Sequence, residues 1–534
     1  MSKVNLEVKQ ADQLNDVALN NDQKHAVDLI IKRIKSGKKS FLLCGKGGTG
    51  KTTVLKAVVA ELEKQHHFAS IDIQAAAFTK AAVAVLRSRA GFKTAATIFK
   101  CLGKREEDWD AGELQFSAPD SRIGIFGKKL YIIDECSYID GRLFTEINKS
   151  FAGSFVLWVG DHCQLHKPKA IGGSSPVFDT FFADPDSFFE LKQIMRQKDS
   201  SRISELGELV RRLINAQDID TVAATRTLFE KSPHVWTNGI DVKIEKRSEI
   251  LSRFKSSVES PNYALSPIRG VFLGFSRKNI AAVEAALGNW FAVGRLVITD
   301  NYAADYKRRD VITGEYRTKD GELKHSRSKA AVDNNCKAII QSIEPVVLLG
   351  CNFYKVELQT LTDALDTITL ENIVVRGSLV EVLYPCDESA YKEWFRARRS
   401  KCLALKNSKP DNKNASITAE TTRECVDIYH KNVSRGILFE DNTPCIIQGN
   451  DSEKSSTKTL YEVLFNDLVK SVCTLRNGYA MTVHKSQGSD YSRVILDLYD
   501  IKKALYLPDV SPDYTLRLLY VAITRARDIL YIAV

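Results

Sequence analysis

The stretch from Phe41 to Thr53, FLLCGKGGTGKTT, decides the fold of this chain. It matches the pattern G-x-x-x-x-G-K-[ST] completely, with an apolar strand leading in and a helical pattern from Thr52 to about Gln65 leading out. Glycines allow successive backbone N–H groups to point at one phosphate, and the positive end of the following helix favours the same anion. The stretch predicts a cradle for a nucleoside triphosphate, but not which class of NTPase contains it.

Several residues of the cradle have an expected role. We expect Lys51 to reach the β and γ phosphates and Thr52 to offer its hydroxyl to Mg²⁺. Upstream, the amide of Gln23 carries a donor and an acceptor in one plane, as the edge of adenine requires, although a surface role is the alternative. The expected nucleotide-binding residues are Gln23, Gly45, Gly47, Gly48, Thr49, Gly50, Lys51, Thr52, Thr53, Gln487 and Gly488.

Composition indicates a multidomain globular protein. The chain has 534 residues, of which 44% are hydrophobic and 27% charged, and this length suits about three or four domains. It contains no run of eighteen apolar residues and no apolar core of a signal peptide near Met1, so we expect a cytoplasmic protein that does not bind membranes. The 11 cysteines form no C-x-x-C pair, which argues for reduced thiols. A net charge of +10 favours a polyanionic partner but is weak evidence alone.

Two adjacent carboxylates end the apolar strand that begins at Tyr131. Alternation along a strand does not explain two neighbouring acids, whereas metal and water chemistry does. We expect Asp134 to belong to the Mg²⁺ shell and Glu135 to orient and deprotonate the attacking water.

A third strand, Phe155 to Val159, leads into the segment GDHCQL. The amide of Gln164 is well placed there to sense a γ-phosphate. His162, Cys163 and His166 are spaced like metal ligands, but no further ligand lies near them in the sequence, so zinc is not favoured.

An arginine, Arg525, lies where a C-terminal apolar helix ends. A buried or interface arginine needs an anion, which is either a structural carboxylate or a γ-phosphate contacted by an arginine finger. We favour the finger.

Other segments have the composition of a nucleic-acid contact. Thr79 and Lys80 follow a second strand, and Thr97 precedes an aromatic and a cation at a loop. Between Gly103 and Gly124 the α/β pattern is interrupted by what we interpret as a small inserted hairpin. Trp109 or Phe116 in this hairpin is either a strand-separating wedge or part of a small core.

The α/β pattern occurs twice, and each copy is interrupted. The expected first domain has residues 1–102 and 125–214, with the hairpin at 103–124. The expected second domain has residues 215–300 and 471–534, and an accessory insertion occupies 301–470. Within that insertion we expect short strands at Val346–Leu358 and Ile368–Leu383 and a charged helix from about Glu388 to Leu405.

The order of the motifs resembles that of superfamily 1 DNA helicases of the RecD and Dda-type branch. The motifs are LNNDQ, GKGGTGKT, AAFTKAA, ATIF, IIDECS, GDHCQLHKP, LKQIMRQ, TVHKSQG and YVAITRAR, and they span about two-thirds of the chain. The layout is similar to that of the Dda-type phage helicases. The resemblance implies an α/β fold with two RecA-like P-loop domains, a pin hairpin in the first, and an SH3-like β-barrel with a helical extension in the second.

The resemblance also implies residue roles. It makes Gln23 the adenine reader and Gln164 the γ-phosphate sensor, with Arg196 and Arg525 as arginine contacts from opposite sides of the cleft. The implied catalytic residues are Lys51, Glu135, Gln164, Arg196 and Arg525. The implied or candidate DNA contacts are Thr79, Lys80, Thr97, Phe99, Trp109, Phe116, Thr482 and His484. The chain departs from the family at Phe99, where histidine is usual, and at His166 and Lys167, where a proline is usual.

The function implied by the resemblance is ATP- and Mg²⁺-dependent translocation on single-stranded DNA, 5′ to 3′, with unwinding of forked DNA in replication, recombination or repair. A monomer in a bacterial or phage-infected cytoplasm is expected, with a single-strand-binding protein among its possible partners. The alternatives are a translocase that strips proteins from single strands and an ATP-switched DNA-binding scaffold. The second half of the chain, with THKSQG and TRAR, argues against the scaffold, and no carboxylate cluster suggests a nuclease.

Overall fold

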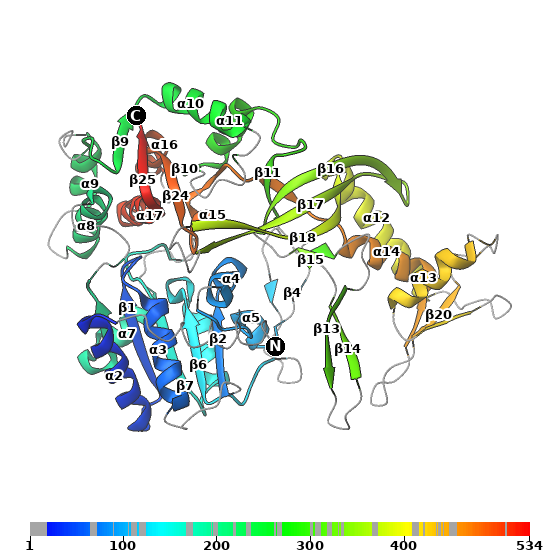
Figure 1. The fold of residues 1–534 in the computed structure, drawn as a ribbon, viewed down its shortest axis with the longest axis horizontal. Helices are drawn as coiled ribbons and strands as arrows, with labels where there is room; N and C mark the ends of the chain where they lie inside the picture. The colour runs from blue at the N-terminus through cyan, green and yellow to red at the C-terminus, as the bar shows by residue number, and fades with distance from the viewer. Residues whose placement is uncertain are drawn as a thin grey trace, which may run out of the picture. The chain divides into compact units, whose positions relative to one another are not determined.

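In the computed structural model, the strand that leads into the glycine-rich loop belongs to a six-stranded parallel sheet (Figure 1). The strand order is β3-β2-β6-β7-β1-β8. The bounds are β1 Ser40–Gly45, β2 Ile73–Ala77, β3 Ala96–Thr97, β6 Leu130–Asp134, β7 Phe155–Gly160 and β8 Phe188–Leu191.

The structure describes residues 19–64, 72–88, 90–104, 106–107, 115–116, 124–166, 175–193, 195, 201–216, 221–230, 236–260, 263, 270–299, 303–304, 311–317, 323–328, 331–332, 336–365, 372–407, 416–419, 422–433, 435, 439, 441, 443–447, 456–507 and 510–534. Across these ranges, every helix is too short or too polar to span a membrane.

The first sheet is buried on both faces, because its strands are continuous apolar runs of the kind found in parallel sheets. Phe41 and Leu43 of β1 point into one core, and Leu42 and Cys44 point into the other. The first core is covered by α2 Asn21–Lys35, α3 Lys51–Lys64 and α4 Lys80–Ser88. The second is covered by α5 Ile98–Cys101, α6 Gly141–Ser150 and α7 Pro176–Phe182.

The register of this sheet aligns the carboxyl ends of its central strands. Cys44 pairs with Gly160, and Ala77 pairs with Asp134. The loops that follow β1, β2, β6 and β7 therefore emerge at one edge, which is where parallel α/β sheets bind ligands.

A second parallel sheet has the order β23-β10-β24-β25-β9. Its strands are β9 Val242–Glu245, β10 Gly270–Gly274, β23 Ala480–Thr482, β24 Tyr491–Asp497 and β25 Ala526–Ala533. The associated helices include α9 Thr221–Glu230, α10 Arg247–Glu259, α11 Arg277–Leu287, α15 Val483–Ser486, α16 Leu498–Lys503 and α17 Pro512–Thr524. The prediction of two parallel-sheet α/β domains is confirmed.

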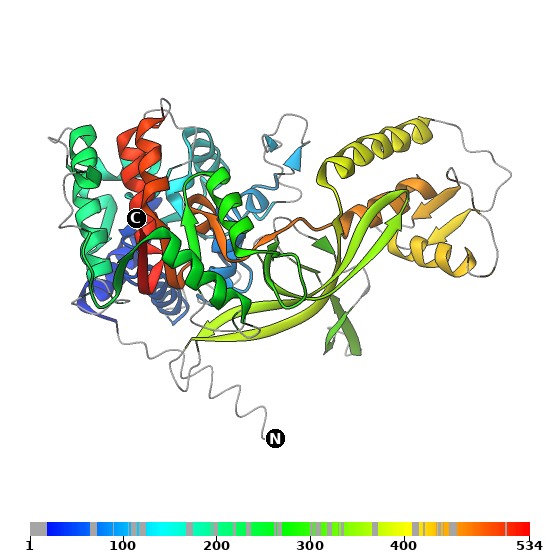
Figure 2. The ribbon, with the colours of Figure 1, turned by 90° about the horizontal axis from the view of Figure 1, so that it is seen from above.

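One helix packs with the second sheet although the sequence pattern assigns it to the first domain. This helix, α8 (Arg202–Asn215), packs against α17 and also contacts α9 and β25. Figure 2 shows α8, in green, beside the red α17. By its packing, α8 belongs with the second sheet.

Both parallel sheets belong to one compact unit, and residues 261–267 and 289–478 form another. The second unit contains an antiparallel sheet of order β18-β17-β16-β11-β22. Backbone bonds from Leu383 to the segment 471–473 join β18 to the chain just before β22, so the two edges of this sheet meet. An SH3-like barrel and the domain boundaries given above stay predictions.

The prediction of a strand from Val346 to Leu358 is wrong. The chain there forms the end of β16, a two-residue turn at Leu349 and Gly350, and the start of β17. Both turn residues have positive φ, 45° and 75°, which suits a tight hairpin. The other expected strand, Ile368–Leu383, corresponds to β18. Leucine at a left-handed turn position gives no turn signal, so the apolar run concealed the hairpin.

The remaining elements are a small strand pair in the predicted hairpin and the strands and helices of the second unit. Glu106–Glu107 (β4) pairs antiparallel with Gln115–Phe116 (β5), inside the stretch predicted to be a hairpin. The elements of the second unit are β11 Leu296–Thr299, β12 Ala303–Ala304, β13 Val311–Arg317, β14 Leu323–Ser328, β15 Ala331–Val332, β16 Lys337–Leu348, β17 Cys351–Leu365, β18 Asn372–Pro385, α12 Glu388–Asn407, β19 Ile417–Ala419, α13 Thr422–Val433, β20 Pro444–Ile447, β21 Ser456–Thr459, α14 Leu460–Lys470 and β22 Leu475–Asn477.

Candidate functional site

The glycine-rich loop has the backbone shape that its sequence predicts. Gly48 and Gly50 have φ of 87° and 84°, in the left-handed region that favours glycine. A Cβ added at Gly50 would overlap Nε2 of Gln23, whereas one added at Gly47 meets nothing within 4 Å. Gly50 is therefore required by the local structure itself.

Gln23 fastens helix α2 to this loop. Its Oε1 accepts from the backbone N–H of Asn20 at 3.1 Å, as part of a capping box, and its Nε2 donates to the carbonyl of Thr49 at 3.0 Å. The side chain is buried. Both ends of the amide thus hold the loop in place, and contact with adenine remains a prediction.

Lys51 begins helix α3 and folds back over the loop. Its Nζ donates to the carbonyls of Gly45 at 2.7 Å and Lys46 at 3.0 Å. The ammonium group is therefore held at the mouth of the cradle. Lys46 in turn forms an ion pair with Glu208 of α8.

The two carboxylates at the end of β6 are in the expected place. Asp134 Oδ1 accepts the backbone N–H of Glu135 at 2.9 Å, and Glu135 has a φ of 55°, a strained value for a residue with a side chain. Burial and the neighbouring Asp134 raise the pKa of Glu135 to about 7, against the opposing charges of Arg525 and Lys51. Such a carboxyl titrates where a general base is useful.

The residues at this edge suit a magnesium ion. The carboxylate of Asp134 and the hydroxyl of Thr52 are hard oxygen donors, the type that Mg²⁺ prefers. Burial raises the pKa of Asp134 in the protein alone, although Lys51 and a backbone hydrogen bond oppose the shift. A cation beside Asp134 would compensate this cost of burying its charge.

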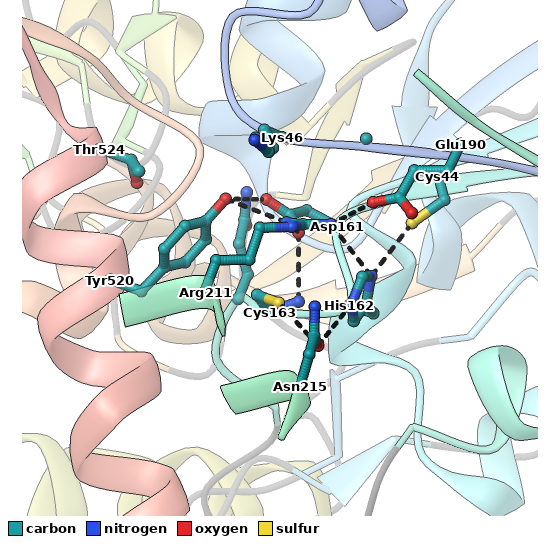
Figure 3. Close-up of polar contacts among 12 residues, drawn as sticks. Cys44, Lys46, Asp161, His162, Cys163, Glu190, Arg211, Asn215, Tyr520 and Thr524 are labelled. Carbon is teal, nitrogen blue, oxygen red and sulfur yellow. Dashed lines mark hydrogen bonds and ion pairs between the residues drawn. The ribbon is translucent and has the colours of Figure 1, made fainter. Parts of the chain in front are cut away.

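A buried ion pair lies at the end of β7, beside the cradle (Figure 3). Arg211 of α8 donates to Asp161 Oδ1 at 2.7 Å, and the hydroxyl of Tyr520, from α17, donates to Asp161 Oδ2 at 2.7 Å. The two charged side chains are 4% and 0% exposed. Burial disfavours the ionised Asp161, but Arg211 outweighs this effect and lowers the pKa of the carboxyl. Asp161 thus ties the first sheet to helices of the second.

His162 and Cys44 lie beside the same arginine. His162 Nδ1 is 3.4 Å from Cys44 Sγ and 3.3 Å from Arg211 Nη2. Cys44, His162 and Glu190 could in geometry hold a metal. However, Arg211 already contacts Glu190, and burial raises the pKa of the Cys44 thiol to about 12. The guanidinium charge therefore disfavours a cation here.

Gln164, the predicted γ-phosphate sensor, contacts Gln487, another predicted nucleotide-binding residue. Gln487 Nε2 donates to Gln164 Oε1 at 3.0 Å, and Gln487 Oε1 accepts from the hydroxyl of Tyr138 at 2.6 Å. Both amides are buried. Gly488, the next residue, would bring a Cβ within 3.8 Å of Ala82 in α4.

Arg525 caps the C-terminal end of α17 and is buried. Its guanidinium donates to the carbonyls of Ser489 at 2.9 Å and Val521 at 3.2 Å. Its charge acts on Glu135, which places it near the carboxylates. A second arginine of α17, Arg517, donates to the carbonyl of His162. The second sheet therefore contributes two cations to the edge of the first.

The expected DNA contacts have structural roles as well. The Oγ1 atoms of Thr79 and Thr97 accept the backbone N–H groups of Ala82 and Lys100, at the starts of α4 and α5. Thr482 precedes α15, and the His484 ring stacks on Tyr514 and hydrogen-bonds its hydroxyl.

Some predicted residues cannot be placed. Arg196, Trp109 and Lys167 lie outside the described residues, as do the side chains of Lys80 and Phe116. Thr53 is the third residue of α3, and Phe99 packs edge-on against Phe78.

Sequence reasoning missed the residues that connect the motifs. The sequence motifs predict no role for Asp161, Arg211, Tyr138, Arg517 and Tyr520. Asp161 follows a buried strand directly and could have been noticed on that ground. An arginine or tyrosine within a helix gives no such signal.

Two families match the chain. Residues 18–228 match the AAA domain family, and residues 477–533 match the UvrD-like helicase C-terminal domain family. The ATP-dependent DNA helicase dda of Enterobacteria phage T4 is 29% identical over 182 residues, 33% of this chain and 39% of that protein. The chain is therefore similar to superfamily 1 helicases of the Dda type. Residues 45–53 lie within the AAA domain match, and their binding of a nucleotide stays a prediction.

Other similar proteins add less. An uncharacterised protein of Methanocaldococcus jannaschii, MJ1519, is 24% identical over 97% of this chain and 38% of its own length. The chain thus spans 38% and 39% of the lengths of the two curated relatives that it matches. The Pif1 helicase of Candida albicans is 16% identical, with 97% of this chain and 95% of that chain covered and a TM-score of 0.39. A Bacteroides Pif1 helicase in complex with ADP-AlF3 and ssDNA is 13% identical, with 97% and 92% covered and a TM-score of 0.40. Structural likeness of this degree establishes neither fold nor activity.

Proposed function

We propose that this protein is an ATP-dependent DNA helicase that moves along single-stranded DNA and separates duplexes. The observation that carries the proposal is that residues of the second sheet reach the nucleotide edge of the first. Gln487 contacts Gln164 there, and the charge of Arg525 acts on Glu135. A nucleotide held by one domain and contacted by the other couples hydrolysis to domain movement.

The nucleotide is ATP with Mg²⁺. Lys51 binds its terminal phosphates, and Glu135, with a pKa near 7, orients and deprotonates the attacking water. Asp134 and Thr52 hold the ion, which, when bound, neutralises charge on the phosphates. Gln164 reads the γ-phosphate, and Arg525 stabilises the charge that develops as the bond breaks.

The DNA-binding residues are on the segments next to this edge. Thr79, Thr97, Thr482 and His484 follow strands or start helices there, and Lys80 adds a cation. Hydroxyl and ammonium contacts to phosphates make DNA binding independent of the DNA sequence and sensitive to salt. We propose 5′ to 3′ movement, action on forked DNA in replication, recombination or repair, and a cytoplasmic monomer that works with a single-strand-binding protein.

The decisive experiment compares matched duplexes that carry only a 5′ tail or only a 3′ tail. We expect ATP-dependent unwinding of the 5′-tailed duplex, and none by Lys51→Ala, which lacks the phosphate contact. ATPase without unwinding of either substrate, but with release of a bound protein from single strands, would instead support a translocase. ATPase activity retained in Lys51→Ala would contradict the cradle assignment.

Arg525→Ala tests the completion of the site from the second domain. We expect ATP binding to persist while turnover falls roughly 10³-fold or more, as for other arginine fingers. The measurements are the affinity for a nucleotide and the DNA-stimulated kcat. Weaker binding with unchanged turnover per bound ATP would assign Arg525 a binding role only.

A further inference from the structure

A chain of hydrogen bonds with one direction runs from Tyr138 to the sensor glutamine. The Tyr138 hydroxyl donates to Gln487 Oε1 at 2.6 Å, and Gln487 Nε2 donates to Gln164 Oε1 at 3.0 Å. An amide has its acceptor on one side and its donors on the other. Each bond therefore fixes the orientation of the next group along the chain.

The last group in the chain is the Nε2 of Gln164. Because Oε1 of Gln164 accepts from Gln487, its N–H groups are the ones left to meet an anion at the nucleotide edge. In the reverse orientation the carbonyl oxygen would face the γ-phosphate and repel it. The orientation of both amides therefore matters for sensing.

Tyr138 is suited to start this chain. A tyrosine that donates must keep its proton, and burial raises the pKa of Tyr138, with the charge of Glu135 adding to the shift. The ring is also held, since it lies parallel to Phe78 at 5.2 Å between centroids with an interplanar angle of 11°.

The same ring leads to the proposed DNA-binding segments. Phe78 precedes Thr79 and meets Phe99 edge-on at 5.4 Å, and Phe99 lies two residues after Thr97. Contacts between packed groups are the means by which two sites influence each other. Tyr138 thus touches the amide chain with its hydroxyl and the DNA-side aromatic pair with its ring.

We propose that Tyr138 is a positioning residue that orients Gln487 and Gln164 toward the γ-phosphate and links them, through Phe78, to the DNA-binding segments. This inference rests on the proposed ATPase function. The hydrogen bonds from Tyr138 through Gln487 to Gln164 polarise one another, which strengthens Nε2 of Gln164 as a donor.

The test is a double-mutant cycle on DNA-stimulated ATPase in the full chain. Tyr138→Phe keeps the ring and its stacking but removes the donor. We expect its kcat to fall about three- to tenfold, the equivalent of one hydrogen bond, with KM for ATP changed less than about twofold. In a Gln164→Ala background the same change should have no further effect, because Tyr138 acts through Gln164.

A second variant tests the link to DNA. Phe78→Leu keeps the Tyr138 hydroxyl but loses the stacked ring, and we expect stimulation by single-stranded DNA to fall by a larger factor than DNA-free turnover. Equal effects of Tyr138→Phe in both backgrounds, or a wild-type kcat in that variant, would overturn the inference and leave the proposed function intact. Absence of DNA-stimulated ATPase in the wild-type protein would overturn both. Thermal melts of each variant separate these outcomes from misfolding.

Discussion

At the scale of single residues, Gly50 and Gly47 make a matched pair. Both belong to the cradle, but only Gly50 has a left-handed backbone and a neighbour, Gln23, in the place of a Cβ. We expect Gly50→Ala to lower the free energy of unfolding by more than about 1 kcal/mol, because it strains the loop and displaces Gln23. Gly47→Ala should change it by less than about 0.5 kcal/mol.

Urea unfolding of the two variants measures the difference. Equal stability of the two alanine variants would show that the loop relaxes around Gly50. Nucleotide affinity is recorded separately, since a methyl group at Gly47 can obstruct phosphate without affecting the fold.

His166 predicts a pH dependence of stability. Burial and the charge of Arg517 lower its pKa to about 4, from an ordinary value of 6.5. Its Nδ1 is 3.3 Å from the carbonyl of Ser137, and its Nε2 has no partner among the described residues. Because the unfolded chain takes up the proton more readily, stability falls as pH drops from 6.5 to about 4 and stays level below that.

The matched variant is His166→Gln, which keeps a polar side chain but does not titrate. The wild-type protein should lose roughly 2 kcal/mol more than this variant between pH 7 and pH 4, after a discount for partial exposure. The free energy of unfolding is measured at intervals across this range. Parallel curves for the two proteins would mean that His166 is solvated in the native state.

The residues that could be predicted from sequence are those whose chemistry depends on close neighbours in the chain. Lys51, Asp134 and Glu135 have adjacent glycines or apolar strands that define their setting. Arg211 and Tyr138 have none, because their partners lie far away in sequence and meet them only after folding. The interpretation of Gln23 was incomplete for the same reason, since its partner in the loop, Thr49, is 26 residues away.

At the scale of elements, α8 joins the two sheets through one buried arginine. Arg211 donates to Asp161 after β7 and to Glu190 in β8, while α8 itself packs on α17. Arg211→Met would leave Asp161 charged and buried without its ionic partner, although the Tyr520 hydroxyl still donates to it. We expect a loss of about 3–5 kcal/mol in the free energy of unfolding.

The neighbouring Arg212 is the control. Its side chain is 77% exposed, and its Nε forms a surface ion pair with Glu208 Oε1 at 3.7 Å. Arg212→Ala should therefore change the free energy of unfolding by less than about 0.5 kcal/mol. Urea denaturation of both variants gives the comparison. A small effect of Arg211→Met would indicate that Asp161 takes up a proton or finds water when the arginine is removed.

Elements were predictable where one pattern governs a whole stretch. The expected strand Phe155–Val159 and the helix expected from Thr52 to about Gln65 lie within one residue of β7 and α3. The hairpin at Leu349 and Gly350 and the packing of α8 were not predictable, because each depends on tertiary contacts. For α8, the amphipathic pattern requires a core to face but does not identify the sheet that supplies it.

At the scale of the whole molecule, the two compact units should fold independently. Each has its own buried clusters, and the described nucleotide-site residues belong to the unit that contains both parallel sheets. The main segment of the second unit, residues 289–478, has neighbouring strands near its two ends, since Gly478 donates to the carbonyl of Leu296 at 3.1 Å. A two-residue Asn-Gly turn can therefore replace residues 297–477 without stretching the chain.

We expect the shortened protein to unfold cooperatively and to bind ATP as the full chain does, with Lys51→Ala as the non-binding control. Calorimetry and nucleotide titration measure both properties. Loss of ATP binding in a folded shortened protein would mean that the second unit helps to shape the nucleotide site, and a failure to fold would mean that the parallel sheets depend on it for their stability.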